Sequence, residues 1–219
     1  MKISLVVSTR DNLKYLKWSY NSIRKNQGDH EVWICYGIDH CTDGTQEWIE
    51  EIKKIDPFVK SIENKTGKRY GHTIMYDQII YKLIETDLAM IFHSDMYLCP
   101  GALDAIERLM YDWDLNEIYK LIDRMPSGDL GKCYELKAIK NRIVSLTRIE
   151  PPLHPSGLEK IVAQFGTEPE DFKENEFIDF VRHTQKKYGN IEPTNGVFAP
   201  WAFWVDEFKE IGGHDALFA

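Results

Sequence analysis

The stretch that decides the fold is Ile3-Ser4-Leu5-Val6-Val7-Ser8-Thr9-Arg10-Asp11. Residues 3–7 are apolar apart from Ser4 and are largely β-branched, which is typical of a buried strand, and the polar residues 8–11 end that strand. Asp11 or Asn12 can then cap a helix whose apolar residues recur at helical spacing. These apolar residues are Leu13, Leu16, Tyr20 and Ile23. The first part of the sequence therefore predicts a strand, a polar loop and a helix.

The same order of elements repeats as far as about Met110. Strands are predicted over residues 32–36, 58–62 and 88–92, and a helical pattern follows each of them. The apolar helix positions are Trp48, Ile49, Ile52 and Ile55, then Met75, Ile79 and Leu83, and finally Leu103, Ile106 and Met110 after Pro100. Strands that alternate with helices imply right-handed crossovers and a mostly parallel sheet with both faces covered. We therefore predict an α/β fold with a Rossmann-like sheet over residues 1–110.

The remaining residues show a different pattern. From Asp112 onward, charged helical segments are separated by prolines, and no clear strand follows until Val197. We predict that residues 111–219 form a mainly helical half that covers the edge of the sheet. The chain ends in the apolar residues Ala216-Leu217-Phe218-Ala219 without an evident stop, so we expect it to be truncated at its C-terminus.

Composition excludes several classes of protein. The 219 residues are 43% hydrophobic, enough for a sizeable core, and the net charge of −8 repels nucleic acid and anionic membranes. No uninterrupted apolar run is longer than that of residues 88–92, which is far short of the ~20 residues that cross a bilayer. The four cysteines are scattered without a Cys-x-x-Cys pair, as expected of reduced thiols. These features predict a cytoplasmic protein without a transmembrane segment that does not bind nucleic acid.

Polar residues follow the predicted strands at their carboxyl ends. Open parallel sheets bind ligands at this edge. Here the strand ends are residues 8–11, 37–43 and 93–97. The side chains of these segments are therefore the first functional candidates.

Four motifs, three of them at these strand ends, resemble the ordered motifs of family 2 glycosyltransferases with the GT-A fold. They are Val6-Val7-Ser8-Thr9-Arg10-Asp11, then Asp39 with Thr42-Asp43-Gly44-Thr45, then Phe92-His93-Ser94-Asp95, and finally Ile211-Gly212-Gly213-His214-Asp215. The resemblance implies a glycosyltransferase that moves a sugar from a nucleotide-sugar donor, expected to be a UDP sugar, to a hydroxyl of a glycan or another acceptor. It also implies inversion at the sugar and assistance by a metal ion. Residues from about 112 to 191 match nothing general to the family.

The resemblance places the donor on Thr9, Arg10, Asp11, Asp39, Lys68, Ser94 and Asp95. A uracil ring presents an N–H between two carbonyls, so its site needs a carboxylate acceptor beside hydrogen-bond donors. Asp39 and Thr9 fill these places, although the first of the family's two adjacent acids is replaced by Ile38. The alternative is that Asp39 and Asp43 cap the following helix. That alternative is favoured for Asp43, which forms a plausible capping pair with Gln46.

The family's metal-binding Asp-x-Asp motif reads His93-Ser94-Asp95 in this chain. Asp95 and His93 are therefore the predicted ligands of a divalent cation, Mn²⁺ or Mg²⁺. Histidine favours Mn²⁺ because imidazole is a softer ligand than carboxylate. The alternative for His93 is a hydrogen-bonded histidine at the end of a strand. Lys68 and its basic neighbours, Lys65, Arg69 and His72, either screen phosphate charge or form a solvated face.

Acceptor residues are predicted in the second half of the chain. Arg148 and His154 lie in a segment stiffened by Pro151, Pro152 and Pro155. Trp201 lies in an aromatic segment and is the predicted stacking platform for a sugar ring. Its neighbours Phe198, Phe203 and Trp204 are predicted core residues of a late strand.

The identity of the general base stays open in the sequence. An inverting transferase needs a general base, such as a carboxylate, that takes the proton of the acceptor hydroxyl. In the family this acid follows the Gly-Gly-x-Asp turn, but the chain stops at Ala219, so the candidates are Asp215 and Glu150. A degenerate nucleotide-sugar or glycan-binding module would also fit these features. A nucleotidyltransferase is the other alternative, although it would require a glycine-rich phosphate loop, which residues 8–12 lack.

Overall fold

The computed structural model describes residues 1–111, 143–153, 160–188 and 198–214. The first of these ranges contains the predicted alternation of strands and helices. The strands are β1 (Lys2–Thr9), β2 (Glu31–Ile38), β3 (Val59–Glu63) and β4 (Leu88–Ile91). The helices are α1 (Leu13–Asn26), α2 (Thr45–Ile55), α3 (Gly71–Leu83) and α4 (Ala102–Tyr111). β1 pairs in parallel with β2 and with β4, and β2 pairs in parallel with β3, as the pattern predicted.

The second half contributes strands as well as helices. Its elements are β5 (Val144–Ser145), β6 (Arg148–Glu150), β7 (Lys160–Val162), α7 (Glu174–Tyr188), β8 (Trp201–Trp204) and α8 (Val205–Glu210). The sequence did not predict β5, β6 or β7, because strands of two or three residues are too short to show alternation. The late strand predicted from Val197 begins at Trp201 in the structure.

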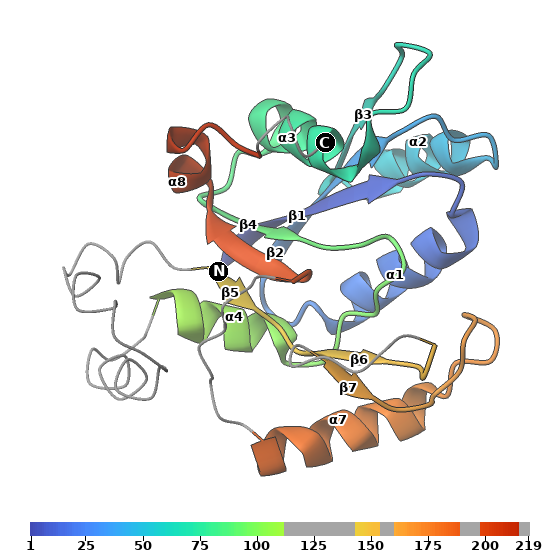
Figure 1. Ribbon diagram of the computed structural model, residues 1–219, viewed down its shortest axis with the longest axis vertical. Coiled ribbons are helices and arrows are strands. Elements are labelled where there is room, and N and C mark those ends of the chain that lie inside the picture. The colour runs from blue at the N-terminus through green and yellow to red at the C-terminus, as the bar shows by residue number, and fades with distance from the viewer. Residues whose placement is uncertain (112–142, 154–159, 189–197, 215–219) are drawn as a thin grey trace.

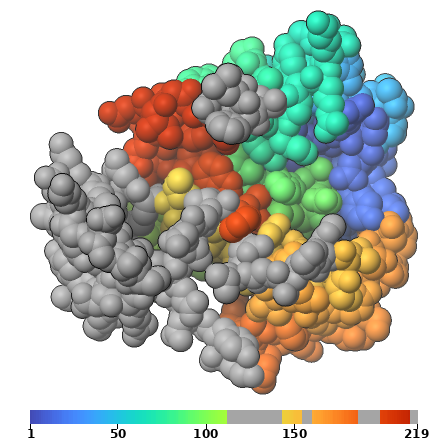
Figure 2. Space-filling view, in the orientation of Figure 1, coloured from blue at the N-terminus to red at the C-terminus, as the bar shows by residue number. Residues whose placement is uncertain are grey.

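One continuous sheet joins the two halves. Its order is β3-β2-β1-β4-β8-β5, and β8 pairs antiparallel with β4 and with β5 (Figure 1). An antiparallel edge on an otherwise parallel sheet is a common arrangement in α/β proteins. β6 and β7 form a separate two-stranded sheet beside α7. In the space-filling view, the orange surface of this second unit adjoins the blue surface of the first residues of the chain (Figure 2).

Apolar side chains pack on both faces of the large sheet. One face is covered by α1, α2 and α4, and the other by α3 and α8. In β8 the alternation of side chains sends Ala202 and Trp204 to the first face and Trp201 and Phe203 to the second. Phe203 is buried, as predicted, whereas Phe198 is 43% exposed, so its assignment to the core was wrong. Phe198 lies before β8, outside the strand, and its ring contacts the guanidinium of Arg148, whose Cζ lies 5.8 Å from the ring centroid.

A close approach of helix and sheet brings α3 onto β2. A Cβ atom added to Gly37 would lie 2.7 Å from the Cε of Met75 and 2.8 Å from the Cδ1 of Ile79. Glycine at this position therefore lets α3 pack directly on the strand. No helix in the described part of the chain combines the length and the apolar character needed to cross a bilayer.

Candidate active site

Three parallel strands end next to one another and bring their polar extensions to one edge of the sheet. Thr9 is the last residue of β1, and its carbonyl accepts a hydrogen bond of 3.0 Å from the N–H of Asp39, just after β2. Ser94 lies three residues after β4, and its Oγ accepts a hydrogen bond of 3.1 Å from Asn12 at the start of α1. The segments that the sequence singled out therefore meet in space.

Asp39 is buried and is held by the segment that leads into α3. Its Oδ1 accepts a hydrogen bond of 2.7 Å from the amide of Asn64, and its Oδ2 accepts one of 3.0 Å from the N–H of Gly71. The N–H of Tyr70 lies 3.1 and 3.2 Å from the two oxygens. Burial raises the pKa of Asp39, but these hydrogen bonds outweigh it and hold the pKa below its usual range. An ionised Asp39 therefore fixes the loop over residues 64–71 to the end of β2.

Asp11 and Asp43 brace the neighbouring loops across the sheet edge. Asp43 accepts hydrogen bonds from the N–H of Leu13, at 2.8 Å, and from the N–H and hydroxyl of Thr45. Asp11 accepts hydrogen bonds from the N–H and hydroxyl of Thr42. The first turn of α1 is thus capped from the opposite loop, and not by Asp11 or Asn12 as predicted, because the two loops lie against each other.

The expected pairing of Asp43 with Gln46 does not form. Gln46 donates instead to Glu63, at 3.1 Å. Asp43 is still a helix-capping residue, because it accepts hydrogen bonds at the starts of both α1 and α2. The prediction of a capping role for Asp43 is therefore confirmed, with a different partner.

His93 and Asp95 lie in the turn that follows β4. Asp95 is exposed, whereas His93 is partly buried and stacks on His72 with ring centroids 6.0 Å apart. Burial lowers the pKa of His93, and the charges of His72 and Arg148 lower it further, against the opposing effect of Asp95. The pKa of His93 therefore lies below its usual value, and its imidazole is neutral near neutral pH.

The residue types of this pair, one imidazole and one carboxylate, are ligands that divalent cations accept. Metal binding requires a neutral imidazole, and the lowered pKa of His93 favours that state. Mg²⁺ and related cations at nucleotide sites are held by one or two protein carboxylates together with substrate phosphates and water, so two protein ligands are sufficient. The described residues hold one group of three potential ligands within 4.8 Å of one another, namely Asp11, Cys41 and Asp43. The hydrogen bonds of Asp11 and Asp43 to the loops already assign these two acids a structural role.

A chain of rings connects the His93 turn to the end of the described chain. Tyr76 of α3 lies between His72 and His214, with ring centroids 5.9 and 6.2 Å away. His214 is anchored to α3, because its Nδ1 lies 2.6 Å from the Oδ1 of Asp77 and its N–H lies 3.2 Å from the Oδ2. Tyr76 and Asp77 were not among the residues predicted from sequence. Their contacts with His214, which lies 137 positions after Asp77, depend on tertiary structure alone.

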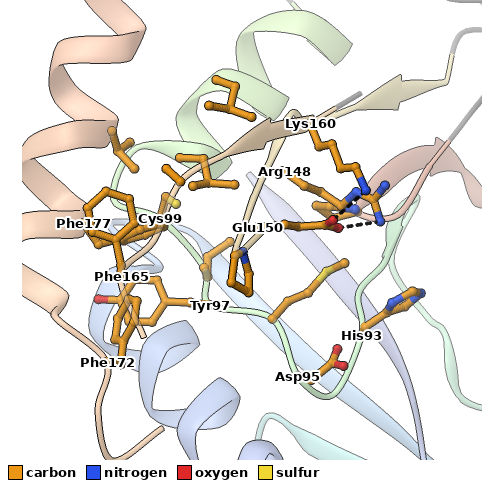
Figure 3. Close-up of a pocket in the computed structure, with 18 of the residues that line it drawn as sticks. His93, Asp95, Tyr97, Cys99, Arg148, Glu150, Lys160, Phe165, Phe172 and Phe177 are labelled. Carbon is orange, nitrogen blue, oxygen red and sulfur yellow. Dashed lines mark hydrogen bonds and ion pairs between the residues drawn. The ribbon is translucent and has the colours of Figure 1, made fainter. Parts of the chain in front are cut away.

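A cavity of about 1040 Å³ opens beside His93 and Asp95. One side of it, here called the charged wall, consists of Arg148 and Glu150 from β6 and Lys160 from β7 (Figure 3). Glu150 pairs with Arg148 at 3.1 Å through one oxygen and with Lys160 at 3.0 Å through the other. The ion pairs explain how the long side chains are held against the cavity.

The opposite side of the cavity, here called the aromatic wall, is formed by rings from four segments of the chain (Figure 3). Neighbouring rings pack at centroid distances of 5.0–5.6 Å, mostly tilted or edge-on. These rings belong to Trp18, Tyr97, Phe165, Phe172 and Phe177. By sequence, this part of the chain showed only charged helical segments. Its packing against α1, as in the contact of Phe172 with Trp18, depends on tertiary structure.

The remaining predicted residues are distributed around this site. Arg148, Glu150, His93 and Asp95 line the cavity, whereas Trp201 is not one of its described lining residues. The ring of Trp201 packs 4.8 Å from Phe203, on the α3 side of the sheet. Arg10 and Lys68 are exposed. The predicted residues His154 and Asp215 lie outside the described part of the chain.

Comparisons with known proteins agree with this architecture. No family model matches the sequence, and no curated protein matches it either. Among solved structures, TarS residues 1–349 from S. aureus superimpose with a TM-score of 0.55 and 14% identity, over 96% of this chain and 49% of that one. The mannosyltransferase PcManGT from Pyrobaculum calidifontis, in complex with GDP-Man and Mn²⁺, gives a TM-score of 0.52 and 12% identity, over 97% and 47%. The chain thus spans about half the length of these two proteins, and it has the GT-A fold of glycosyltransferases.

Proposed function

We propose that this protein transfers a sugar from a nucleotide-sugar donor to a hydroxyl acceptor. The observation that carries the proposal is the meeting of Thr9, Asp39 and the His93–Asp95 turn at one edge of a GT-A sheet, directly beside a large cavity. Donor and acceptor need adjacent sites, because the acceptor hydroxyl must approach the anomeric carbon while the nucleotide is bound. The edge and the cavity supply two such sites.

A UDP sugar is the donor that we propose. Thr9 Oγ1 is buried and has no hydrogen-bond partner among the described residues, so a nucleotide bound there would satisfy it. The Asp39 carboxylate is engaged by Asn64 and by the start of α3, so its contribution includes positioning the loop of residues 64–71. A direct hydrogen bond from uracil to Asp39 stays a prediction. The GDP-Man and Mn²⁺ bound by PcManGT support a metal-assisted nucleotide-sugar reaction in this fold.

His93 and Asp95 are the residues that would hold the cation. Bound there, a divalent cation would neutralise the negative charge that develops on the departing diphosphate. His72 stacks behind His93, and Ser94 is fixed by Asn12, so the turn is oriented before any ligand arrives. We propose Mn²⁺ over Mg²⁺, since one of the two protein ligands is a nitrogen.

For an inverting displacement, the chain also needs a base. Both oxygens of Glu150 are occupied by Arg148 and Lys160, which gives Glu150 a role in shaping the cavity. Asp215 is therefore our preferred candidate for the base. The variant Asp215→Asn should retain donor binding and lose transfer by about 10²- to 10⁴-fold, the range that general-base catalysis contributes.

Calorimetry with UDP, with and without Mn²⁺, tests the donor site. We expect Mn²⁺ to increase UDP affinity in the parent protein and to have no such effect in Asp95→Asn. The matched control is Asp29→Asn, which removes the same charge from an exposed position before β2. A Mn²⁺ effect that persists in Asp95→Asn would remove the metal from the His93 turn, and absence of UDP and GDP binding would refute the donor site.

Turnover distinguishes the enzyme from its alternatives. A transferase releases UDP from a UDP sugar through slow hydrolysis, even without acceptor, whereas a binding module shows affinity without turnover. A nucleotidyltransferase would instead form pyrophosphate from a nucleoside triphosphate and a sugar phosphate. We expect UDP release and no pyrophosphate.

The scattered cysteines, of which Cys35, Cys41 and Cys99 are free thiols, support the cytoplasm as the proposed compartment.

A further inference from the structure

The cavity beside the His93 turn has two chemically different ends. The charged wall, with the ion pairs of Glu150, lies at the end near His93, and the aromatic wall lies across from it (Figure 3). Its volume of about 1040 Å³ is at the upper end of the range of ~300–1,000 Å³ typical of small-molecule sites. A single ligand can therefore contact both ends.

The aromatic wall is built to exclude polar groups. The hydroxyl of Tyr97 donates to Glu174 and accepts a hydrogen bond of 3.1 Å from Asn26, so it is already engaged within the protein. The hydroxyl of Tyr15, which also lines the cavity, donates to Glu168 at 2.7 Å. The other rings of the wall are three phenylalanines and Trp18. A sugar hydroxyl buried against this surface would lose its hydrogen bonds to water without replacement.

The packing around these rings differs from that of a hydrophobic core. A packed core contains few voids larger than a water molecule, whereas these rings face a cavity large enough for a ligand. The wall is also connected to α1. Lys14 pairs with Glu168 before α7, and Lys25 pairs with Glu174, the first residue of α7, at 2.8 Å. The rings therefore already surround the cavity in this structure.

We infer that the acceptor is amphipathic: a hydroxyl-bearing group lies at the His93 and charged-wall end, and an apolar aglycone lies against the aromatic wall. The aglycone is an aryl group or a short alkyl chain. This inference rests on the proposed function for the identity of the reaction. The binding of the aglycone itself can be measured without any donor.

The first test compares three glucosides that differ in the aglycone alone, namely methyl, hexyl and phenyl β-D-glucopyranoside, and then the same three galactosides. Burial of an aryl or alkyl group should increase affinity at least about tenfold over the methyl compound in calorimetry. A preference for phenyl identifies an aryl aglycone, and a preference for hexyl identifies an alkyl one. Equal affinities within both sugar series, in folded parent protein, would overturn the inference.

The second test places a larger side chain in the cavity, at the residue that follows β7. Ala163 lines the cavity, whereas its neighbour Val162 is 40% exposed and does not line it. Ala163→Phe should abolish the preference for the larger aglycone, and the matched control Val162→Phe should retain it. If Ala163→Phe does not fold, Phe172→Ala provides the second variant, because it removes one ring of the aromatic wall and should reduce the preference. A preference unchanged in folded Ala163→Phe or Phe172→Ala would place the aglycone elsewhere and refute the inference.

UDP binding in the presence of Mn²⁺, measured on the same samples, separates the two proposals. Ala163→Phe should bind UDP as the parent does, because Ala163 lines the cavity whereas Thr9 and Asp39 do not. Normal UDP binding without any aglycone preference in the parent refutes the acceptor inference alone. Aglycone preference without UDP binding refutes the proposed function alone.

Discussion

Replacing Asp39 by alanine should destabilise the protein more than any other removal of an acid at the sheet edge. The Asp39 carboxylate is buried and accepts hydrogen bonds from Asn64, Tyr70 and Gly71. Each hydrogen bond to a charged group contributes about 1.5–3 kcal/mol, and the contributions are not additive. We therefore expect Asp39→Ala to lower the free energy of unfolding by about 3–5 kcal/mol. For a chain of this length, this corresponds to a decrease in Tm of roughly 6–20 °C.

The effect of Asp39 on stability should depend on pH with a defined sign. Because the pKa of Asp39 is lower in the folded than in the unfolded chain, its stabilising contribution is complete above the unfolded value of about 3.9. The contribution is lost as the pH falls through the lower, folded value. Thermal denaturation of parent and Asp39→Ala should therefore show a constant difference in Tm from about pH 7 to about pH 5. The difference should shrink below about pH 4.

The control for Asp39→Ala is Asp95→Ala. Asp95 carries the same charge at the same edge but is exposed, so its removal should change stability by no more than about 0.5 kcal/mol. Asn64→Ala removes one hydrogen-bond partner of the Asp39 carboxylate and keeps the acid itself. It therefore tests whether Asp39 affects donor binding by positioning the loop of residues 64–71. Equal stability of Asp39→Ala and the parent at neutral pH would refute the reasoning. So would a stability difference that grows in acid.

Three further substitutions have expected outcomes. Asp95→Ala should abolish the Mn²⁺-dependent part of UDP affinity and leave uridine binding unchanged in calorimetry, since the metal contacts the diphosphate. Gly37→Ala should lower the free energy of unfolding by about 1–3 kcal/mol in denaturant titrations, because the added Cβ would overlap the side chains of Met75 and Ile79. A neutral effect would show that these side chains or α3 can shift. Trp201→Ala should cost about 2–4 kcal/mol through its packing with Phe203, and an unchanged acceptor KM in the folded variant would end its role as an acceptor platform.

The order of the first strands and helices could be predicted because their signals are local. Residues 3–7 and 88–92 are buried on both sides, so they are apolar throughout except at Ser4, and the helices between them show clear periodicity. β5, β6 and β7 could not be predicted. β5 forms because β8 offers it a partner, and β6 and β7 form because they pair with each other. Strands of this length have no pattern of their own.

The candidate site also combines features that the sequence predicted with features that it did not. Parallel strands must end at one edge, so the grouping of Thr9, Asp39 and Asp95 followed from the alternation of elements together with the resemblance to GT-A enzymes. The roles of the acids at that edge did not follow. Asp43 caps α1 from the neighbouring loop, and Asp39 binds the start of α3. The hydrogen-bond partners of these acids depend on the distances between loops, and these distances leave no pattern in a single sequence.

The sequence by itself determined the α/β class, the parallel order of the first strands and the edge at which sheets of this kind bind ligands, because burial and strand direction leave periodic traces in residue type. Tertiary structure alone decided that Trp201 packs on the α3 side and that rings from α1, the turn after β4 and α7 form one wall of a cavity. It also decided that Glu150 is paired with two cations. The physical reason is that a cavity and its charge balance are properties of surfaces brought together from distant segments, so that no one segment carries their pattern.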